Sequence, residues 1–210
     1  MKKSILLLAT VTHLFIHTME NKQQDCSSKT SEFIVYHPDY NINTFGLQSF
    51  VPVLGPLTTR PRTVLSDLNI SNDHILTAQE ITETNLKHVH TQDFLDKLKN
   101  SPTEMLKLAC IPASSTTENK YASYIPNCFS KNYILHSMRL ATGGTIQAME
   151  LALKEDGMRF AFNLSGGYHH AKTDGSSYAG FCLYNDVAIA TRIAIEKYGK
   201  KKILEPIPKL

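Results

Sequence analysis

The chain has 210 residues, of which 42% are hydrophobic, and its formal net charge at pH 7 is +3. This length and apolar content are enough for one sizeable core, and no internal repeat or shift in composition indicates a second domain. Acidic and basic residues are interspersed, so the sequence lacks the basic patch that direct nucleic-acid binding requires. The four cysteines show no C-x-x-C spacing, which predicts neither a zinc knuckle nor a disulfide framework.

Residues 1–32 are predicted to form an N-terminal extension. A basic start and an apolar run from Ile5 to Ile16 are typical of a secretory signal, but His13 and His17 interrupt the pattern and no A-x-A cleavage site follows. The apolar run is also shorter than the roughly 20 residues that a membrane-spanning helix needs. Met19 serves equally well as the start of a cytoplasmic protein, which is the expectation here, with export as the alternative.

The next segments are predicted to begin an α/β domain. Phe33 to Tyr36 is the first expected strand, and a loop punctuated by proline and glycine is expected to continue to Arg62. Residues 63–70 and the flank from His74 to Ile81 predict a helix or turn and then a second short strand.

A helix is predicted to follow, with Thr84 as its cap and apolar positions that continue to Leu98. His88 and His90 lie two residues apart, so they cannot share one face of a helix. Metal ligation by these two histidines is one interpretation, and a capped structural turn is the favoured one.

A segment rich in Ser, Thr, Asn and Pro lies between Cys110 and Asn132, and its length suits either a substrate mouth or a surface loop. The segment from Ile134 to Lys154 then predicts a helix that contains Gly143 and Gly144. Each internal glycine costs a helix about 1 kcal/mol relative to alanine, so we expect close backbone packing at this pair.

The stretch from Ala161 to Ala190 is the part of the sequence that is typical of an active site. Phe160 to Leu164 reads as a short buried strand, a loop begins near Ser165, and apolar residues at helical spacing predict a helix that ends near Tyr198. Ligands of open α/β sheets bind between strand ends and the following helices. Adjacent imidazoles, here His169 and His170, can divide the roles of general base and general acid near neutral pH. A pair of solvated loop histidines is the alternative interpretation.

Three short motifs in this stretch, SGGYHH, a loop of nine residues and GFCLYND, stand in the order and at nearly the spacing of one enzyme family. Together they resemble the active-site segment of the zinc-dependent histone deacetylases, closest to the class IV branch. The segments FIVYHPDYNI, VHTQDFLDKL and ATGGTIQAMELAL resemble successive upstream landmarks of that family. The resemblance covers residues 33–204 and implies an α/β fold, a three-layer αβα arrangement with a mostly parallel sheet, of which this chain has about the N-terminal half.

The resemblance also implies roles for individual residues. His169 and His170 match the catalytic pair, while Gly166 and Gly167 match the active-site turn that carries it. Gly180 and Phe181 match the lining of the tunnel that holds an acetyl-lysine stem. Residues 184–186 match the start of the next helix, where Asp186 is expected to act as a helix-terminal charge rather than as a catalyst. The implied substrates are acetylated or acylated lysine proteins or acetylpolyamines.

The sequence departs from the family pattern after Leu204. The zinc ligands of the family, two aspartates and a histidine, would follow His170 but are absent, so no zinc is expected to be held by this chain. Pro206 and Pro208 are incompatible with a central strand, and residues 205–210 read as an unrelated tail. Three interpretations are left open. The chain is an incomplete deacetylase that is inactive alone and results from a shifted reading frame, or it is an inactive module that binds acyl-lysine or a partner. The third interpretation is a non-functional truncated product.

Overall fold

A parallel sheet forms the centre of the molecule. The computed structural model describes residues 31–41, 55–68, 70–101, 130–154, 159–167, 170–175 and 182–200. Its strands are β1 (Ser31–Tyr36), β2 (Ile75–Thr77) and β3 (Arg159–Asn163), hydrogen-bonded in the order β2-β1-β3 and all parallel. Parallel neighbours require crossover connections, which helices supply here, so the predicted α/β class is confirmed. The predicted strands near residues 33–36, 74–81 and 160–164 are confirmed as well.

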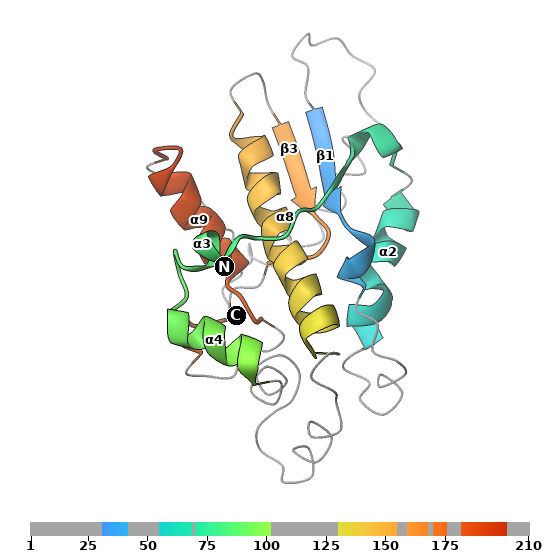
Figure 1. Cartoon of the computed structure of the whole chain (residues 1–210). Coiled ribbons are helices and arrows are strands. Elements are labelled where there is room, and N and C mark those ends of the chain that lie inside the picture. The colour runs from blue at the N-terminus through green and yellow to red at the C-terminus, as the bar shows by residue number, and fades with distance from the viewer. Residues whose placement is uncertain are drawn as a thin grey trace, which may run out of the picture.

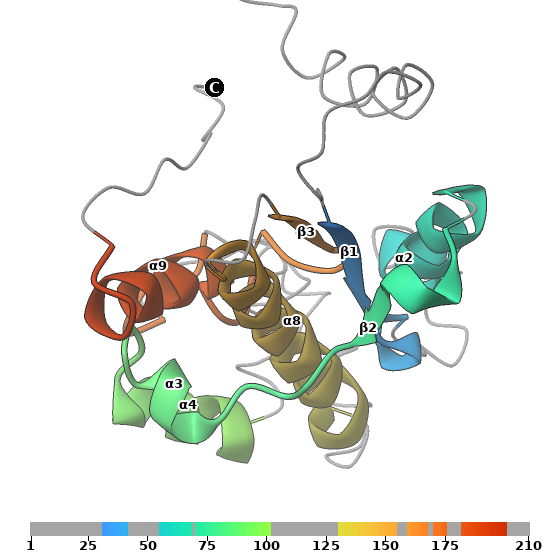
Figure 2. The same cartoon turned by 90° about the horizontal axis from the view of Figure 1, so that it is seen from above.

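Helices cover both faces of this sheet. Helix α8 (His136–Ala152) crosses one face over β1 and β3, with α9 (Asp186–Glu196) at its side (Figure 1). Helix α2 (Gly55–Leu68) lies on the opposite face (Figure 2). Both predicted helices after residue 134 are therefore confirmed, and the described elements are arranged in three layers.

The main core lies between α8, α9 and two short helices. The first short helix is α3 (Glu83–Leu86) and the second is α4 (Gln92–Asn100). The fully buried side chains of this core include Leu86, Leu95, Leu98, Leu183 and Ile189. Remaining short elements are 3₁₀ turns η1 (Pro38–Tyr40) and η4 (Asn72–His74) and a π-helical turn η5 (Ser130–Leu135) that leads into α8. Within the described ranges, no helix is both long and apolar enough to cross a bilayer.

The strand β3 is less buried than predicted. Ala161 and Asn163 face α8, because Ala161 packs against the cluster that contains Leu140 and the amide of Asn163 donates to a carbonyl of α8. Side chains alternate along a strand, so Phe160 and Phe162 point to the other face, where they are 46% and 42% exposed. The prediction of a fully buried strand was therefore wrong for one of its two faces.

The glycine pair in α8 packs as predicted. A Cβ atom on Gly143 would stand 2.8 Å from the backbone nitrogen of Ile81, and closer still to the carbonyl oxygen of Gln79. A Cβ atom on Gly144 would stand 2.7 Å from Oδ1 of Asn163. Only a residue without a Cβ lets α8 approach both neighbours, so close packing compensates for the lower helix propensity.

Two predictions about helix boundaries were wrong. The loop expected up to Arg62 is helical from Gly55, with Pro61 inside α2. Proline lacks an N–H and normally disturbs the preceding turn of a helix. The next N–H, on Arg62, donates to Oδ1 of Asn41 at 3.2 Å. This contact ties α2 to the end of η1.

The expected cap at Thr84 is also replaced. Thr82 caps α3 by accepting from the N–H of Asn85, and Thr91 caps α4 by accepting from the N–H of Phe94. Two short capped helices therefore stand where one was predicted, because the turn at His88 to His90 interrupts the run. Most of the segment from Cys110 to Asn132 lies outside the described residues.

Candidate active site

The candidate site lies at the edge where the parallel strands end. After β1 the chain forms η1, after β2 it runs from Ala78 to Ile81, and after β3 it enters the turn at Ser165 to Gly167. The first turn of α8 reaches the same edge, since the Ser137 hydroxyl donates to the backbone oxygen of Asp39. Strand ends of α/β sheets gather loops of distant sequence, which is why ligand sites form there.

Gly166 and Gly167 are both required by the turn, for different reasons. A Cβ atom on Gly166 would lie 2.5 Å from Oγ1 of Thr145 and 2.8 Å from Oδ2 of Asp186, so there is no room for one. Gly167 has open space around it but a φ of +81°, a conformation that other residues adopt only at a cost. The prediction that these glycines form a turn is consistent with both observations.

Asn163, the last residue of β3, organises a group of polar side chains under this turn, of which Tyr40 and Asp186 are buried and Thr145 and Asn163 are half-buried. Its Nδ2 lies 2.7 Å from the Ala141 oxygen, 2.9 Å from Oγ1 of Thr145 and 2.6 Å from the Ser165 oxygen. Its Oδ1 accepts from the Tyr40 hydroxyl at 2.7 Å. We call Tyr40, Thr145, Asn163 and Asp186 the buried junction. It joins η1, α8, β3 and α9 at one point.

Asp186 completes the buried junction from the first turn of α9. Its side chain has 0% exposure, and Oδ2 accepts from the Thr145 hydroxyl at 2.5 Å and from the Gly167 N–H at 2.9 Å. The sequence predicted a helix-terminal charge here, and the position in the first turn is confirmed. The prediction did not anticipate that this carboxylate binds the active-site turn directly.

His170 follows the turn on an exposed stretch of chain. Its Nδ1 lies 3.8 Å from the Sγ atom of the buried Cys182, and the next residue, Ala171, is buried. His169, Gly180 and Phe181 lie outside the described residues, so their predicted roles stay predictions. The structure therefore places one of the two predicted catalytic histidines, and both glycines of the turn, at the carboxyl edge of the sheet.

His90 has a structural position, as the favoured interpretation predicted. Its side chain is buried between Phe94 and Tyr184, and its Nε2 accepts from the backbone N–H of Asn185 at 3.0 Å. Burial lowers the pKa of His90, although the nearby backbone groups of residues 172 and 173 oppose that shift. A neutral imidazole with one nitrogen accepting from the backbone ties the α3–α4 turn to the start of α9.

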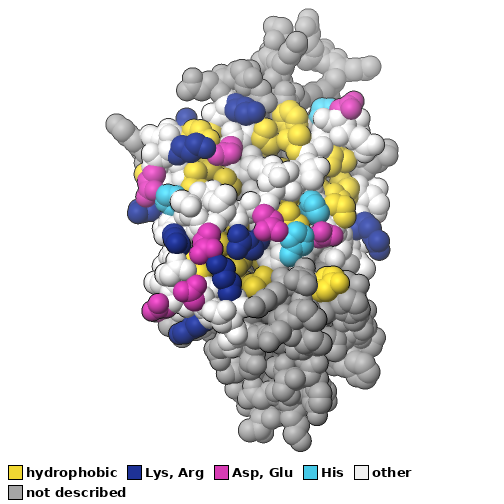
Figure 3. Space-filling view, in the orientation of Figure 1, with side chains coloured by type: hydrophobic (Ala, Val, Ile, Leu, Met, Phe, Trp, Pro, Cys, Tyr) yellow, Lys and Arg dark blue, Asp and Glu magenta, His cyan; other side chains and the backbone are white. Residues whose placement is uncertain are grey.

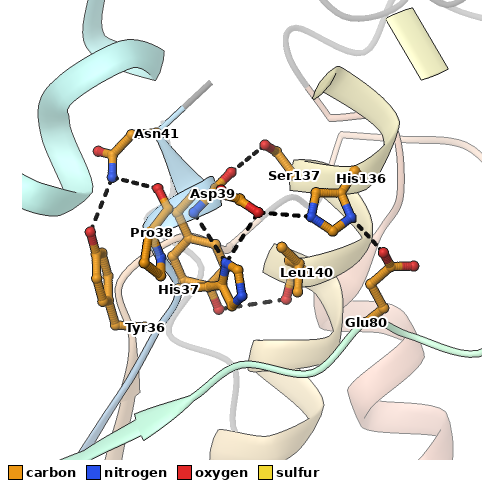
Figure 4. A network of polar contacts seen from close by, with 10 residues as sticks. Tyr36, His37, Pro38, Asp39, Asn41, Glu80, His136, Ser137 and Leu140 are labelled. Atoms are coloured by element: carbon orange, nitrogen blue, oxygen red, sulfur yellow. Dashed lines mark hydrogen bonds and ion pairs between the residues drawn. The ribbon is translucent and has the colours of Figure 1, made fainter. Parts of the chain in front are cut away.

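A second polar group at this edge was not predicted. His136 Nδ1 lies 2.5 Å from Oε1 of Glu80, and His136 Nε2 lies 3.0 Å from Oδ2 of Asp39 (Figure 4). Arg139 Nε lies 3.2 Å from Oε2 of the same glutamate. We call Asp39, Glu80, His136 and Arg139 the acid–histidine cluster. Histidine and acidic side chains are visible together near the middle of the face in Figure 3.

The acid–histidine cluster favours a charged imidazole. Partial burial lowers the pKa of His136, but hydrogen bonds and charges of Asp39 and Glu80 outweigh burial and raise it overall. The geometry agrees, because only the imidazolium can donate from both ring nitrogens. These side chains line an open pocket of about 1010 Å³, together with Lys99. Its described lining does not include Gly166, Gly167 or His170.

The described residues do not fit a metal site. Across the described ranges, no three His, Cys, Asp or Glu side chains stand together in a way that could hold a metal ion.

Comparisons with known proteins agree with the motifs. The family model described as "Histone deacetylase domain" matches residues 58–205. Histone deacetylase 2 of Arabidopsis thaliana is 26% identical over 172 residues, which cover 81% of this chain and 41% of that protein. The polyamine deacetylase HDAC10 of Danio rerio is 25% identical over 126 residues, which cover 60% of this chain and 17% of that protein.

Among solved structures, the HDAC homolog from Aquifex aeolicus has a similar fold. The TM-score is 0.51 at 22% sequence identity, and the match covers 80% of this chain and 42% of that one. This likeness supports the arrangement of helices and parallel strands. The chain spans about two-fifths of the length of the first curated relative and of this solved structure.

Proposed function

Because this chain belongs to the histone deacetylase family, we propose that it supplies the histidine loop, residues 167–171, of an amide hydrolase that removes acetyl or acyl groups from lysine-type amines. The observation that supports this most directly is the turn at Gly166 and Gly167, which leads into His170 at the carboxyl edge of the sheet. The proposed substrates are acetylated or acylated lysine proteins and acetylpolyamines.

In this proposal His169 and His170 transfer protons. One accepts a proton from the attacking water and the other donates a proton to the leaving amine, which is the usual division of labour between two groups that titrate near neutral pH. Gly180 and Phe181 line the channel for the acyl-lysine stem. The apolar stem of the substrate would be excluded from water there, while the amide reaches the histidines.

The family is generally zinc-dependent. The described residues do not fit a zinc site, as reported above, so no step of the proposed proton transfer is assigned to the metal. We propose that zinc enters the reaction through ligands that this chain does not provide.

A chimera tests the proposal. Residues 33–204 would replace the matching segment of the Aquifex aeolicus homolog, and acetate release from an acetyl-lysine peptide and from an acetylpolyamine would be measured. We expect turnover by the chimera and a loss of about 100-fold or more on His170→Ala, the usual scale for losing an acid or base. Zinc content, measured by mass spectrometry after dialysis against a mild chelator, should be stoichiometric in the chimera and not in the 210-residue chain.

The matched control is His88→Ala. His88 is a half-buried histidine whose Nδ1 pairs with Oε2 of Glu196 at 2.9 Å, away from the candidate site. This variant should retain turnover. A folded chimera that releases no acetate, or one in which the two variants lose the same activity, would count against the proposed function. Stoichiometric zinc in the unfused chain would count against the metal assignment alone.

A further inference from the structure

We propose that Asn185 and Asp186, consecutive residues where α9 begins, hold the histidine loop from both sides and act as positioning residues for the reaction. The structural part of this inference rests on contacts at Gly167 and Ala171. Its consequence for turnover rests on the proposed function.

Asp186 holds the loop on its upstream side. Oδ2 accepts from the Gly167 N–H, two residues before His169, and from the Thr145 hydroxyl of α8. A carboxylate with 0% exposure needs strong donors to remain charged, and both of these donors are fixed, one by the turn and one by a long helix. The upstream end of the loop is therefore tied to α8 and α9 at once.

Asn185 holds the loop on its downstream side. Its Nδ2 donates to the oxygen of Ala171, the residue after His170, at 3.1 Å. Its Oδ1 accepts from the Ala188 N–H at 3.0 Å and so caps α9, while its backbone N–H donates to His90. The two catalytic candidates thus lie, in sequence, between one atom bound by Asp186 and another bound by Asn185.

The residue types exceed what a helix start requires. Asp caps helices about as well as Asn but has no donor, whereas the Asn185 side chain caps α9 through Oδ1 and donates through Nδ2 to the Ala171 oxygen. An acidic residue that serves the helix dipole alone can remain in water, whereas Asp186 is fully buried against Thr145 and Gly167. Both side chains therefore have a second function beyond stabilising α9, and in each case the second partner belongs to the histidine loop.

The test uses two conservative variants of the 210-residue chain. Asp186→Asn keeps the shape but leaves one neutral oxygen to serve two donors. Asn185→Asp keeps the helix cap but sets a carboxylate oxygen against the Ala171 carbonyl. The matched control is Asp93→Asn, which removes an exposed acidic residue from the first turn of α4. Amide hydrogen exchange at Gly167 and the titration of the His170 imidazole would be followed by NMR.

We expect Asp186→Asn to raise the exchange rate at Gly167 by about 10-fold or more, since a hydrogen bond to a charged group typically contributes that much. Asn185→Asp should shift the His170 titration while helix content is retained. In the chimera, each variant should lower kcat by about 10-fold or more with KM changed less than about 2-fold, because misplacement affects the transition state more than binding.

Three outcomes decide the inference. Gly167 exchange that is the same in Asp186→Asn and Asp93→Asn would show that Asp186 does not hold the turn. Faster exchange with an unchanged His170 titration and unchanged kcat would reduce both residues to a structural role. If the unsubstituted chimera releases no acetate, the proposed function fails, and the NMR measurements on the chain still decide whether Asn185 and Asp186 hold the loop.

Discussion

Two polar groups tie α8 to the loops at the carboxyl edge of the sheet, and they differ in how much water reaches them. In the buried junction, Asp186 is 0% exposed and Tyr40 is 3% exposed, while Thr145 and Asn163 are half-buried. In the acid–histidine cluster, the side chains of His136, Glu80 and Asp39 are 34%, 42% and 56% exposed. The two groups therefore have similar contact distances, but one is shielded from water and the other is partly exposed to it.

The environment decides what each contact contributes. Removing one partner from a buried hydrogen-bonded group leaves the others unsatisfied and costs about 1–3 kcal/mol. An exposed ion pair contributes about 0–1 kcal/mol, because water and salt screen the charges. We conclude that the buried junction fixes the geometry of the turn, whereas the acid–histidine cluster makes a smaller contribution to the free energy of unfolding, and that contribution depends on pH.

The largest predicted effect comes from the glycines that let α8 reach the two groups. Gly143 faces the backbone on either side of Glu80, and Gly144 faces Asn163 in the buried junction. Gly→Ala normally stabilises a helix by about 1 kcal/mol. Here Gly143→Ala should destabilise the chain by about 3 kcal/mol, because a rigid backbone must move to admit the Cβ. Urea unfolding followed by circular dichroism measures the change.

Gly144→Ala should cost less, since the neighbours of its new Cβ are the ends of side chains. Gly199→Ala is the control, with a φ of +62° and open space around it. Its cost should be about 1 kcal/mol, from backbone conformation alone. If Gly143→Ala is neutral or stabilising, α8 does not need this close approach.

The next largest predicted effect is a loss of stability on replacing an asparagine, and two asparagines can be compared. Asn163→Ala removes the centre of the buried junction and should destabilise the chain by about 2 kcal/mol. Asn41 is the comparison, and its side chain makes three hydrogen bonds, to the Tyr36 hydroxyl, the Pro38 oxygen and the Arg62 N–H. Two of these bonds are exposed to water, whereas those of Asn163 are partly buried, so Asn41→Ala should cost less than about 1 kcal/mol. Equal costs in urea unfolding would contradict the difference in environment.

The sequence predicted the elements better than the contacts between them. Phe33 to Tyr36 and residues 160–164 were identifiable as strands because short apolar runs between turn residues are a local pattern. The packing of Gly143 and Gly144 was also predictable, since helix propensity alone disfavours them. Asp186 was placed correctly in the first turn of α9, but its burial depends on Thr145, which precedes it by 41 residues.

Nothing local in the sequence identified the acid–histidine cluster. Asp39, Glu80 and His136 come from three segments, and His136 is separated from the two acids by 97 and 56 residues. Only the parallel strand order brings the ends of β1 and β2 beside the first turn of α8. The continuation of α2 through Pro61 was also missed, because local propensity disfavours proline inside a helix.

The smallest predicted effect is the pH-dependent contribution of His136 to the free energy of unfolding. Because Asp39 and Glu80 raise its pKa in the folded chain above the ordinary value of about 6.5, its contribution to stability is complete below about pH 6.5 and is lost as the pH rises through the raised pKa. The free energy of unfolding lost on His136→Gln should thus be larger at about pH 5.5 than at about pH 8.5. We expect a difference of about 0.5 kcal/mol, since the cluster is partly exposed.

The free energy of unfolding must be compared between variant and parent at each pH, because His90 changes stability with pH in the opposite direction. Burial lowers the pKa of His90, so its contribution raises stability as the pH increases towards about 6.5. Subtracting the His136→Gln curve from the parent curve removes this background. His74→Gln is the control, since His74 Nδ1 contacts the Glu32 backbone oxygen at 2.8 Å instead of a carboxylate. A His136 difference curve that is flat with pH, or that matches the His74 curve, would mean that the acid–histidine cluster does not hold an imidazolium.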